Sequence, residues 1–238
     1  MTGNQNRTLK LPTGRPRDSF AYWDGATDPG HRHAEPWWIE FYAKELLLYF
    51  PANAGRVLEC GCGTGVFYPY FKDRCESYLG IDFSESMLQD FRLSWPGVQL
   101  VCADAAKLNV GEGALQRGQF DFIFSNQVCQ FFDREKLYRH LEGLAALTRP
   151  AGSCLIANIP DAQLRLHYYV SALRADRSSS WLGGLKRILA ATLGRADGIG
   201  YWHSRRDIAA IARSFGFECE SFSSASFEYR FHLRLRRN

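Results

Sequence analysis

The chain has 238 residues, a hydrophobic fraction of 46% and a formal net charge of +4. These values suit one globular domain with a sizeable core, and they exclude a disordered or fibrous chain. A charge this small is not typical of nucleic-acid-binding proteins, which carry dense basic stripes, so we expect no nucleic-acid partner. No apolar run in the sequence reaches the length needed to span a bilayer.

The seven cysteines are an odd number, many lie within apolar runs, and none forms a C-x-x-C pair. This usage favours reduced core thiols and a cytoplasmic location. Without paired cysteines or an H-E-x-x-H motif, no metal site is predicted. The segment from Met1 to Arg17 is polar and lacks the apolar centre of a secretory signal, so residues 1–20 are expected to be a flexible polar tail.

Residues 21–55 are predicted to form an N-terminal lid and helix. The lid is rich in aromatic residues, including Tyr22, and is long enough to fold over a bound ligand and exclude water. A helix is expected over 35–50, where apolar residues recur at helical spacing after a proline placed for a helix start. In the alternative interpretation three aromatic residues only bury one face of this helix: Trp37, Trp38 and Phe41.

From Arg56 onward the pattern alternates between strands and helices, which predicts βαβ units and a parallel sheet. Five strands are expected, at 57–60, 77–82, 98–103, 120–125 and 152–159. The helices between them are expected at 65–74, 84–94 and 133–148. Residues 56–160 would thus form the core of the protein.

Residues 204–238 complete the predicted fold with a helix at 204–214 and two strands at 218–222 and 227–236. No helix fits between these two strands, so they should pair antiparallel. The fold class is therefore α/β, a doubly wound, mostly parallel seven-stranded sheet with a C-terminal antiparallel hairpin. Alternate residues of the last strand predict a solvated face: Glu228, Arg230, His232, Arg234 and Arg236.

The clearest chemical signal is the run from Val57 to Gly65 (VLECGCGTG), an apolar strand that opens into three glycines. Glycines let the backbone approach a ligand closely, and the following helix offers unpaired N–H groups. The spacing G-x-G-x-G departs from the dinucleotide fingerprint G-x-G-x-x-G, and Glu59 faces the loop. A carboxylate there disfavours a pyrophosphate and suits a positively charged group, such as the ammonium of a methionine moiety.

With these residues the sequence resembles the class I S-adenosylmethionine-dependent methyltransferases, whose first motif commonly reads acid-x-G-x-G-x-G. The resemblance implies that S-adenosyl-L-methionine is the cofactor. Asp82 ends the second strand about 20 residues after the glycines, which is the sequence separation at which such an acid binds a ribose diol. In the alternative interpretation, Asp82 is a solvated residue ahead of the helix capped by Ser84. In the family the acid at Asp104 accepts the adenine amino group, and the alternative is a turn aspartate.

The end of the fourth strand supplies the next signal, because ligands bind at the carboxyl ends of parallel strands. Ser125 and Asn126 should line the pocket beside the methionine part, with Gln127, Gln130 or Phe131 facing the acceptor. The complete set of expected cofactor-binding residues is Tyr22, Glu59, Gly61, Cys62, Gly63, Gly65, Asp82, Phe83, Met87, Asp104, Ala105, Ser125 and Asn126.

The long irregular stretch over residues 161–203 is expected to be an insertion on the acceptor side. Its balance of charge is basic, which favours an anionic or phosphate-bearing acceptor. Within it, residues 181–193 place apolar residues at helical spacing, and this helix could cap the acceptor pocket or rest on an anionic membrane surface.

A hydroxyl acceptor needs a general base, and histidine is the usual candidate. His167 has the best expected location and His33 the second best; His31 and His203 are the other choices, and His140 and His232 are expected to be structural. The predicted function is methyl transfer to a small molecule, most simply to a hydroxyl of a sugar-like or secondary metabolite. The alternatives are N-methylation of a small amine, where no base is needed, a nucleic-acid or protein methyltransferase, a non-catalytic cofactor-binding partner, and a nicotinamide-dependent oxidoreductase.

Overall fold

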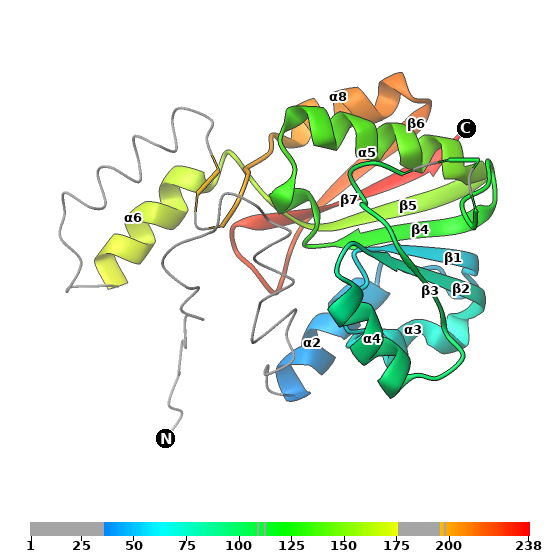
Figure 1. The fold of residues 1–238 in the computed structure, drawn as a ribbon. Coiled ribbons are helices and arrows are strands. Elements are labelled where there is room, and N and C mark those ends of the chain that lie inside the picture. The colour runs from blue at the N-terminus through cyan, green and yellow to red at the C-terminus, as the bar shows by residue number, and fades with distance from the viewer. Residues whose placement is uncertain (1–35, 109, 112, 176–195, 198) are drawn as a thin grey trace.

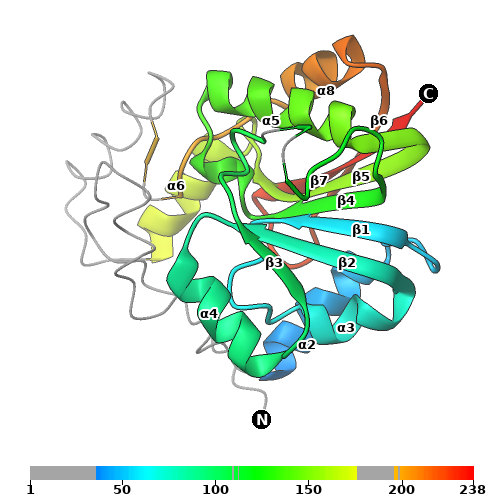
Figure 2. The ribbon, with the colours of Figure 1, turned by 45° about the vertical axis from the view of Figure 1, so that its right-hand side comes forward.

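The structure is a computed structural model and describes residues 36–108, 110–111, 113–175, 196–197 and 199–238. Seven strands form one sheet in the order β3-β2-β1-β4-β5-β7-β6, as Figures 1 and 2 show. The strands are β1 (Gly55–Cys60), β2 (Cys75–Asp82), β3 (Gln99–Cys102), β4 (Phe120–Asn126), β5 (Thr148–Pro160), β6 (Phe217–Ser223) and β7 (Arg230–Arg237).

Strands β1 to β5 run parallel, whereas β7 pairs antiparallel with both β5 and β6. The predicted fold class, with its C-terminal antiparallel hairpin, is therefore confirmed. The strand order reverses between β1 and β4, and such a switch point opens a crevice at the carboxyl ends of the strands. The chain thus places the glycine-rich turn after β1 beside the end of β4.

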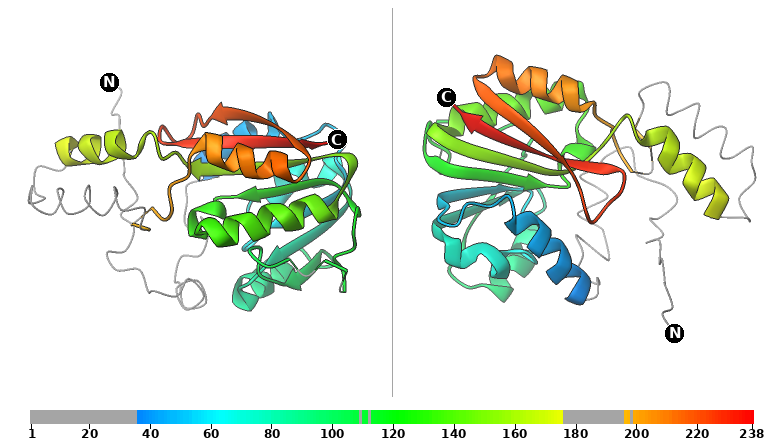
Figure 3. Two further views of the ribbon diagram at one scale, coloured as in Figure 1. Left: turned by 90° about the horizontal axis from the view of Figure 1, so that it is seen from above. Right: turned by 180° about the vertical axis from the view of Figure 1, so that it is seen from behind.

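Helices cover both faces of the sheet, as the two views in Figure 3 show. One face carries α5 (Arg134–Leu147) and α8 (Arg205–Ser214), and the other carries α2 (Pro36–Leu47), α3 (Tyr68–Phe71) and α4 (Glu85–Ser94). The alternation of β1 accounts for the two layers: Leu58 packs into the core with α5 and α8, and Val57 packs into the core with α2, α3 and α4. Both residues are at most 1% exposed.

Two predicted elements differ from the structure. The helix expected over 65–74 is only α3, followed by a 3₁₀ turn at Lys72–Arg74, because the glycine turn extends to Gly65, which lies in the left-handed region. The stretch expected to be irregular after β5 contains α6 (Arg165–Ala175), which extends beyond the carboxyl ends of the parallel strands (Figure 1). Just before α6, the side chain of Asp161 accepts a hydrogen bond from the backbone of Gln163 (3.0 Å).

The prediction of a solvated face on the last strand is wrong for two residues. Arg230 is 5% exposed and His232 is fully buried. The cause is α2, whose Glu45 reaches this face and accepts a hydrogen bond from His232. Only toward the end of β7 does the face open, where Arg236 is exposed.

The alternative in which Trp37, Trp38 and Phe41 together bury one face of α2 does not hold for all three residues. Trp37 is 67% and Phe41 is 51% exposed, so neither buries a helix face. The packed face of α2 instead consists of Tyr42, Ala43 and Leu46. Trp38 does pack, with its ring centroid 5.1 Å from that of Tyr42.

Several predictions lie outside the described residues: the tail at 1–20, the lid with Tyr22, His31 and His33, and the possible membrane helix at 181–193. All seven cysteines are free thiols, and four of them are buried. Among the helices in the described part of the chain, none is long and apolar enough to cross a bilayer.

Candidate active site

The turn after β1 is built on glycines that no other residue could replace without rearrangement. Gly61 and Gly65 have φ values of +77° and +75°, in the left-handed region. A Cβ on Gly61 would lie 2.4 Å from the Val128 side chain, and one on Gly65 would lie 2.4 Å from the ring of Phe91. The turn therefore presents bare backbone toward the carboxyl ends of the strands, as a closely bound cofactor requires.

Asp82 joins this turn to the helix that follows β2. One carboxylate oxygen accepts from the Gly63 N–H (2.9 Å) and the other from the Ser84 N–H (2.9 Å). Ser84 in turn caps α4 by accepting from the Met87 N–H. Burial raises the pKa of Asp82, against the lowering effect of these backbone hydrogen bonds. A carboxylate has about four lone-pair sites, so the group can still accept from a ribose hydroxyl.

Glu59 is buried beneath the turn, with an exposed fraction of 3%. The Tyr78 hydroxyl donates to its carboxylate over 2.5 Å. Burial raises the pKa of Glu59 to about 8, and the nearby charge of Asp82 acts in the same direction. No cationic group among the described residues is paired with Glu59, so its ionised form would be favoured by a cation brought in by a ligand.

The remaining residues expected at the cofactor lie along the same edge. Asp104 accepts from the Ala106 N–H (2.8 Å), which is the turn role weighed above, and its second oxygen remains available. The Ala105 carbonyl accepts a hydrogen bond from His140 Nδ1 (2.7 Å). Cys62 and Met87 are buried against the core, while Phe83 is partly exposed.

The residues that surround the turn contain spare hydrogen-bonding capacity. The hydroxyls of Thr64 in the turn and Ser125 at the end of β4 are both buried and have no hydrogen-bond partner among the described residues. Because buried hydroxyls normally find partners, these two are suited to a polar ligand at this edge. Together with the bare turn and the two acids, they fit the methionine and ribose parts of S-adenosylmethionine.

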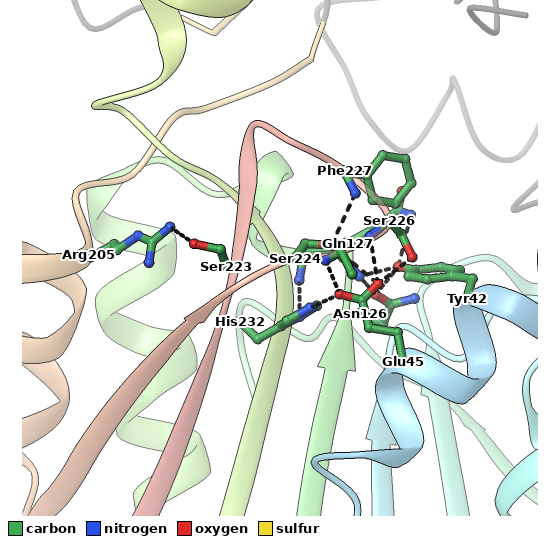
Figure 4. Close-up of polar contacts among 12 residues, drawn as sticks. Tyr42, Glu45, Asn126, Gln127, Arg205, Ser223, Ser224, Ser226, Phe227 and His232 are labelled. Atoms are coloured by element: carbon green, nitrogen blue, oxygen red, sulfur yellow. Dashed lines mark hydrogen bonds and ion pairs between the residues drawn. The ribbon is translucent and has the colours of Figure 1, made fainter. Parts of the chain in front are cut away.

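A second polar cluster follows the ends of β4 and β5, and Figure 4 shows part of it. The Tyr42 hydroxyl of α2 donates to Asn126 Oδ1 (2.5 Å) and accepts from the amides of Gln127 (3.1 Å) and Asn158 (2.5 Å). Gln127 and Asn158 both lie in the left-handed region, with φ near +58° and +57°. Strained non-glycine residues of this kind cluster at functional sites.

Glu45 of α2 lies beside this cluster and is linked to Asn158 through His232. Its carboxylate accepts from His232 Nε2 (2.8 Å) and from the backbone of Ala225 (2.5 Å) and Ser226 (2.9 Å), as well as from the Ser226 hydroxyl. Burial opposes ionisation of Glu45, but these hydrogen bonds outweigh it and lower its pKa to about 2. His232 Nδ1 accepts from the Asn158 N–H (3.2 Å), which fixes the proton on Nε2.

The candidate bases take separate positions. His167 is exposed on α6 and lies 3.5 Å from the Ser171 hydroxyl. His203 is buried, its Nε2 is 2.9 Å from the Cys129 carbonyl, and burial lowers its pKa. His140 is also buried, and burial lowers its pKa to about 4. Of the histidines that the structure describes, His167 alone is exposed, and it lies on α6 in the segment that follows β5.

Sequence reasoning did not identify Tyr42, Glu45, Asn158 or Arg230 as members of the site. Tyr42 and Glu45 lie three residues apart on one helix face, and they contact partners 116 and 187 residues away in the chain. A buried glutamate within an apolar helix face was the one available signal, because such a residue normally has a partner.

The fold and this edge of the sheet define the class I S-adenosylmethionine-dependent methyltransferase architecture. Residues 57–152 match the family model described as a methyltransferase domain. Residues 57–152 therefore form a methyltransferase domain, and the solved structures that share its fold include proteins with bound S-adenosylmethionine or S-adenosylhomocysteine. Among solved structures, it is similar to the N-methyltransferase NodS from Bradyrhizobium japonicum WM9 in complex with S-adenosyl-l-homocysteine, with a TM-score of 0.61 and 15% identity over 92% of this chain and 96% of that chain.

Two curated relatives show the range of acceptors. The chain is 30% identical over 122 residues to a malonyl-[acyl-carrier protein] O-methyltransferase of Pectobacterium atrosepticum, covering 51% of this chain and 46% of the relative. It is 34% identical over 124 residues to a trans-aconitate 2-methyltransferase of Methylobacterium nodulans, covering 50% of this chain and 44% of the relative. The chain thus spans less than half the length of these two relatives.

Proposed function

We propose that this protein transfers a methyl group from S-adenosylmethionine to an oxygen atom of a small-molecule acceptor. The observation that carries the proposal is the arrangement around the glycine turn, where Asp82, Glu59 and two unpartnered hydroxyls surround bare backbone. The proposed division into a lid at 21–55, a core at 56–160, an acceptor-side insertion at 161–203 and a completing segment at 204–238 follows from this assignment.

Each residue has a defined task in the proposal. Asp82 binds the ribose, Asp104 the adenine amino group, and Glu59 the region of the methionine ammonium. When bound, the cofactor supplies a methyl group that forms a bond to the acceptor oxygen as the S–C bond breaks, with sulfur keeping the electron pair. The chain contributes orientation and exclusion of water, which account for most of the catalysis in such a transfer.

The acceptor group is proposed to be a hydroxyl of a sugar-like or secondary metabolite, in which case a base must remove its proton. His167 is the candidate base among the described residues, because His203 and His232 are buried, with Nε2 of His203 and both ring nitrogens of His232 in internal hydrogen bonds. A carboxylate is the second candidate group. It is already ionised at neutral pH and needs no base, and both curated relatives carry names that refer to acidic compounds or their thioesters.

Methyl transfer from isotopically labelled S-adenosylmethionine to a panel of hydroxy acids, sugars and di- and tricarboxylates tests the proposal. Methyl esters release methanol in alkali and methyl ethers do not, so the same assay identifies the acceptor group. A folded protein that binds neither S-adenosylmethionine nor S-adenosylhomocysteine would contradict the proposal, whatever the panel shows.

His167→Ala separates the two acceptor groups. For a hydroxyl acceptor, we expect slower turnover by about 10²-fold with cofactor affinity unchanged, because only the base is lost. Full turnover would return His167 to a surface role and favour the carboxylate.

A further inference from the structure

Arg230 is a buried cation without an acidic partner. It is the first residue of β7 and is 5% exposed. Its Nη1 donates to the Asn158 carbonyl (2.6 Å) and its Nη2 to the Gln130 side-chain oxygen (2.8 Å), while Nε has no hydrogen-bond partner. Both acceptors are neutral, so within the described part of the chain no carboxylate is paired with this guanidinium. A buried charge in this condition is costly to maintain.

Two other arginines show that the missing acidic partner of Arg230 is informative. Arg165 on α6 pairs with Asp197 at 3.0 Å, and Arg205 on α8 pairs with Asp161 at 2.7 Å. Both of these ion pairs lie in the segments that follow β5, near the carboxyl end of the sheet. Each of these two arginines thus has an aspartate partner, whereas Arg230 has no acidic partner among the described residues.

The aromatic surroundings of Arg230 hold its charge without neutralising it. The guanidinium carbon lies 5.2 Å from the ring centroids of both Phe227 and Tyr229. Cation–π contacts use the faces of a guanidinium and leave its N–H edge available for a planar anion. That edge includes the unpartnered Nε–H, and a carboxylate is the group whose geometry matches it.

The position of Arg230 links it to the acceptor side of the site. Asn158, whose carbonyl it binds, donates from its side chain to Asn126 Oδ1 (3.1 Å). Asn126 ends β4, beside the turn that we assign to the cofactor. The Arg230 charge also acts on the Tyr42 hydroxyl of the same polar cluster. Arg230 is therefore connected through Asn158 to Asn126, which we assign to the proposed cofactor pocket.

We propose that Arg230 is the anchor for a carboxylate group of the acceptor, so that the acceptor carries a carboxylate whichever of its oxygen atoms is methylated. This inference rests on the proposed function, because it concerns the acceptor side of that same site. It locates the recognition of an anionic acceptor on β7, away from the arginines of residues 161–203. In the opposing interpretation, Arg230 serves only to hold Asn158 and Gln130 in place.

Formate is the probe that tests the anchor, because it is small enough to enter a carboxylate site of any shape. The linewidth of [¹³C]formate is measured by NMR with the full-length protein, with and without S-adenosylhomocysteine. We expect the wild-type protein to broaden the formate resonance, malonate to reverse the broadening, and neutral formamide to leave it unchanged. An absence of broadening by the wild-type protein would overturn the proposal.

Substitutions assign the effect to one residue. Arg230→Gln should lower formate affinity at least about 30-fold, as expected when one partner of a buried charge pair is removed. Arg230→Lys keeps the charge and loses the fork, so it should bind formate more weakly than the wild type; this variant decides the matter if Arg230→Gln does not fold. Arg234→Gln, on the same strand but paired with Glu220 at the surface, should match the wild type. Wild-type broadening by either Arg230 variant would overturn the proposal.

Calorimetric titration with S-adenosylhomocysteine distinguishes a failure of the proposed methyltransferase function from a failure of the carboxylate site at Arg230. Formate binding without S-adenosylhomocysteine binding would contradict the proposed function and support the anion site. Binding of S-adenosylhomocysteine without formate binding would support the proposed function and overturn the anion site.

Discussion

Two buried glutamates near the proposed site have opposite properties. Glu45, beside the polar cluster at the ends of β4 and β5, accepts hydrogen bonds from His232 and the β6–β7 loop, and its pKa is lowered to about 2. Glu59, beneath the glycine turn, accepts only from Tyr78 among the described residues, and burial raises its pKa to about 8. Both are less than 10% exposed.

The difference between them lies in their partners, since burial is common to both. The surroundings of Glu45 are complete, which is the condition of a structural group that stabilises the fold. The surroundings of Glu59 lack a cation, which is the condition of a group held ready for a ligand. Substitutions that affect the two glutamates differently test this distinction.

Glu45→Gln should have the largest effect. Removing one member of a buried charged network leaves donors on His232 and Ser226 without their acceptor, and we expect a loss of about 4 kcal/mol in the free energy of unfolding. Urea unfolding at pH 7 measures it. Glu40→Gln is the control, because Glu40 forms an exposed i,i+4 pair with Lys44 and should change stability by less than about 0.5 kcal/mol.

The same residue makes a prediction about acid pH. The folded-state pKa of Glu45 is depressed to about 2, so its contribution is present above the unfolded-state value near 4.5 and is lost as the pH falls toward 2. The stability difference between wild type and Glu45→Gln should therefore shrink between pH 4.5 and pH 2. A difference that stays constant over this range would contradict the assignment.

Gly65→Ala tests the cofactor turn. The new methyl group would meet the buried Phe91 ring at 2.4 Å in a left-handed conformation, and we expect a loss of about 3 kcal/mol of stability together with weakened cofactor binding. Gly97→Ala is the matched control: Gly97 also has a positive φ, +91°, but nothing lies within 4 Å of its Cβ position. It should lose only about 1 kcal/mol. Equal losses in thermal unfolding would show that close packing beneath the turn is unimportant.

Asp82→Ala should weaken S-adenosylmethionine binding by about 1.5–3 kcal/mol, because a charge-assisted hydrogen bond to the ribose is lost. Isothermal titration calorimetry measures the change. Asp73→Ala, at an exposed aspartate paired with Lys72, is the control and should bind the cofactor normally. Unchanged affinity in Asp82→Ala would remove Asp82 from the site.

Glu59→Gln should have a smaller effect on stability and one of opposite sign. The folded state holds the Glu59 proton up to a pH of about 8, whereas the unfolded state releases it near pH 4.5, so this group makes the wild type less stable as the pH rises through that interval. We expect the variant to be about 1–2 kcal/mol more stable than the wild type at pH 8, with little difference at pH 4.5, and to bind S-adenosylmethionine less tightly. A variant less stable than the wild type at pH 8 would place Glu59 with Glu45 as a structural group.

The local geometry around the glycine turn could be predicted from the sequence more fully than the polar cluster at the ends of β4 and β5, for a physical reason. The glycine turn and the acid that ends β1 lie within one short run, and Asp82 is only 19 residues from Gly63. Their roles follow from local backbone geometry. The mostly parallel sheet and the terminal hairpin could likewise be predicted from the alternation of strands and helices.

The polar cluster at the ends of β4 and β5, which we propose to face the acceptor, depends on contacts between distant segments. Tyr42 meets Asn158 across 116 residues and Glu45 meets His232 across 187. Alternation along β7 predicted a solvated face, but α2 covers the start of that strand and buries Arg230 and His232. A pattern within one strand cannot show which helix packs against it.

Calorimetric titration with S-adenosylmethionine, S-adenosylhomocysteine and NAD in parallel tests the central claim most directly. The account predicts micromolar binding of the two adenosyl ligands and no binding of NAD. A folded protein that bound NAD, or that bound neither adenosyl ligand, would contradict it.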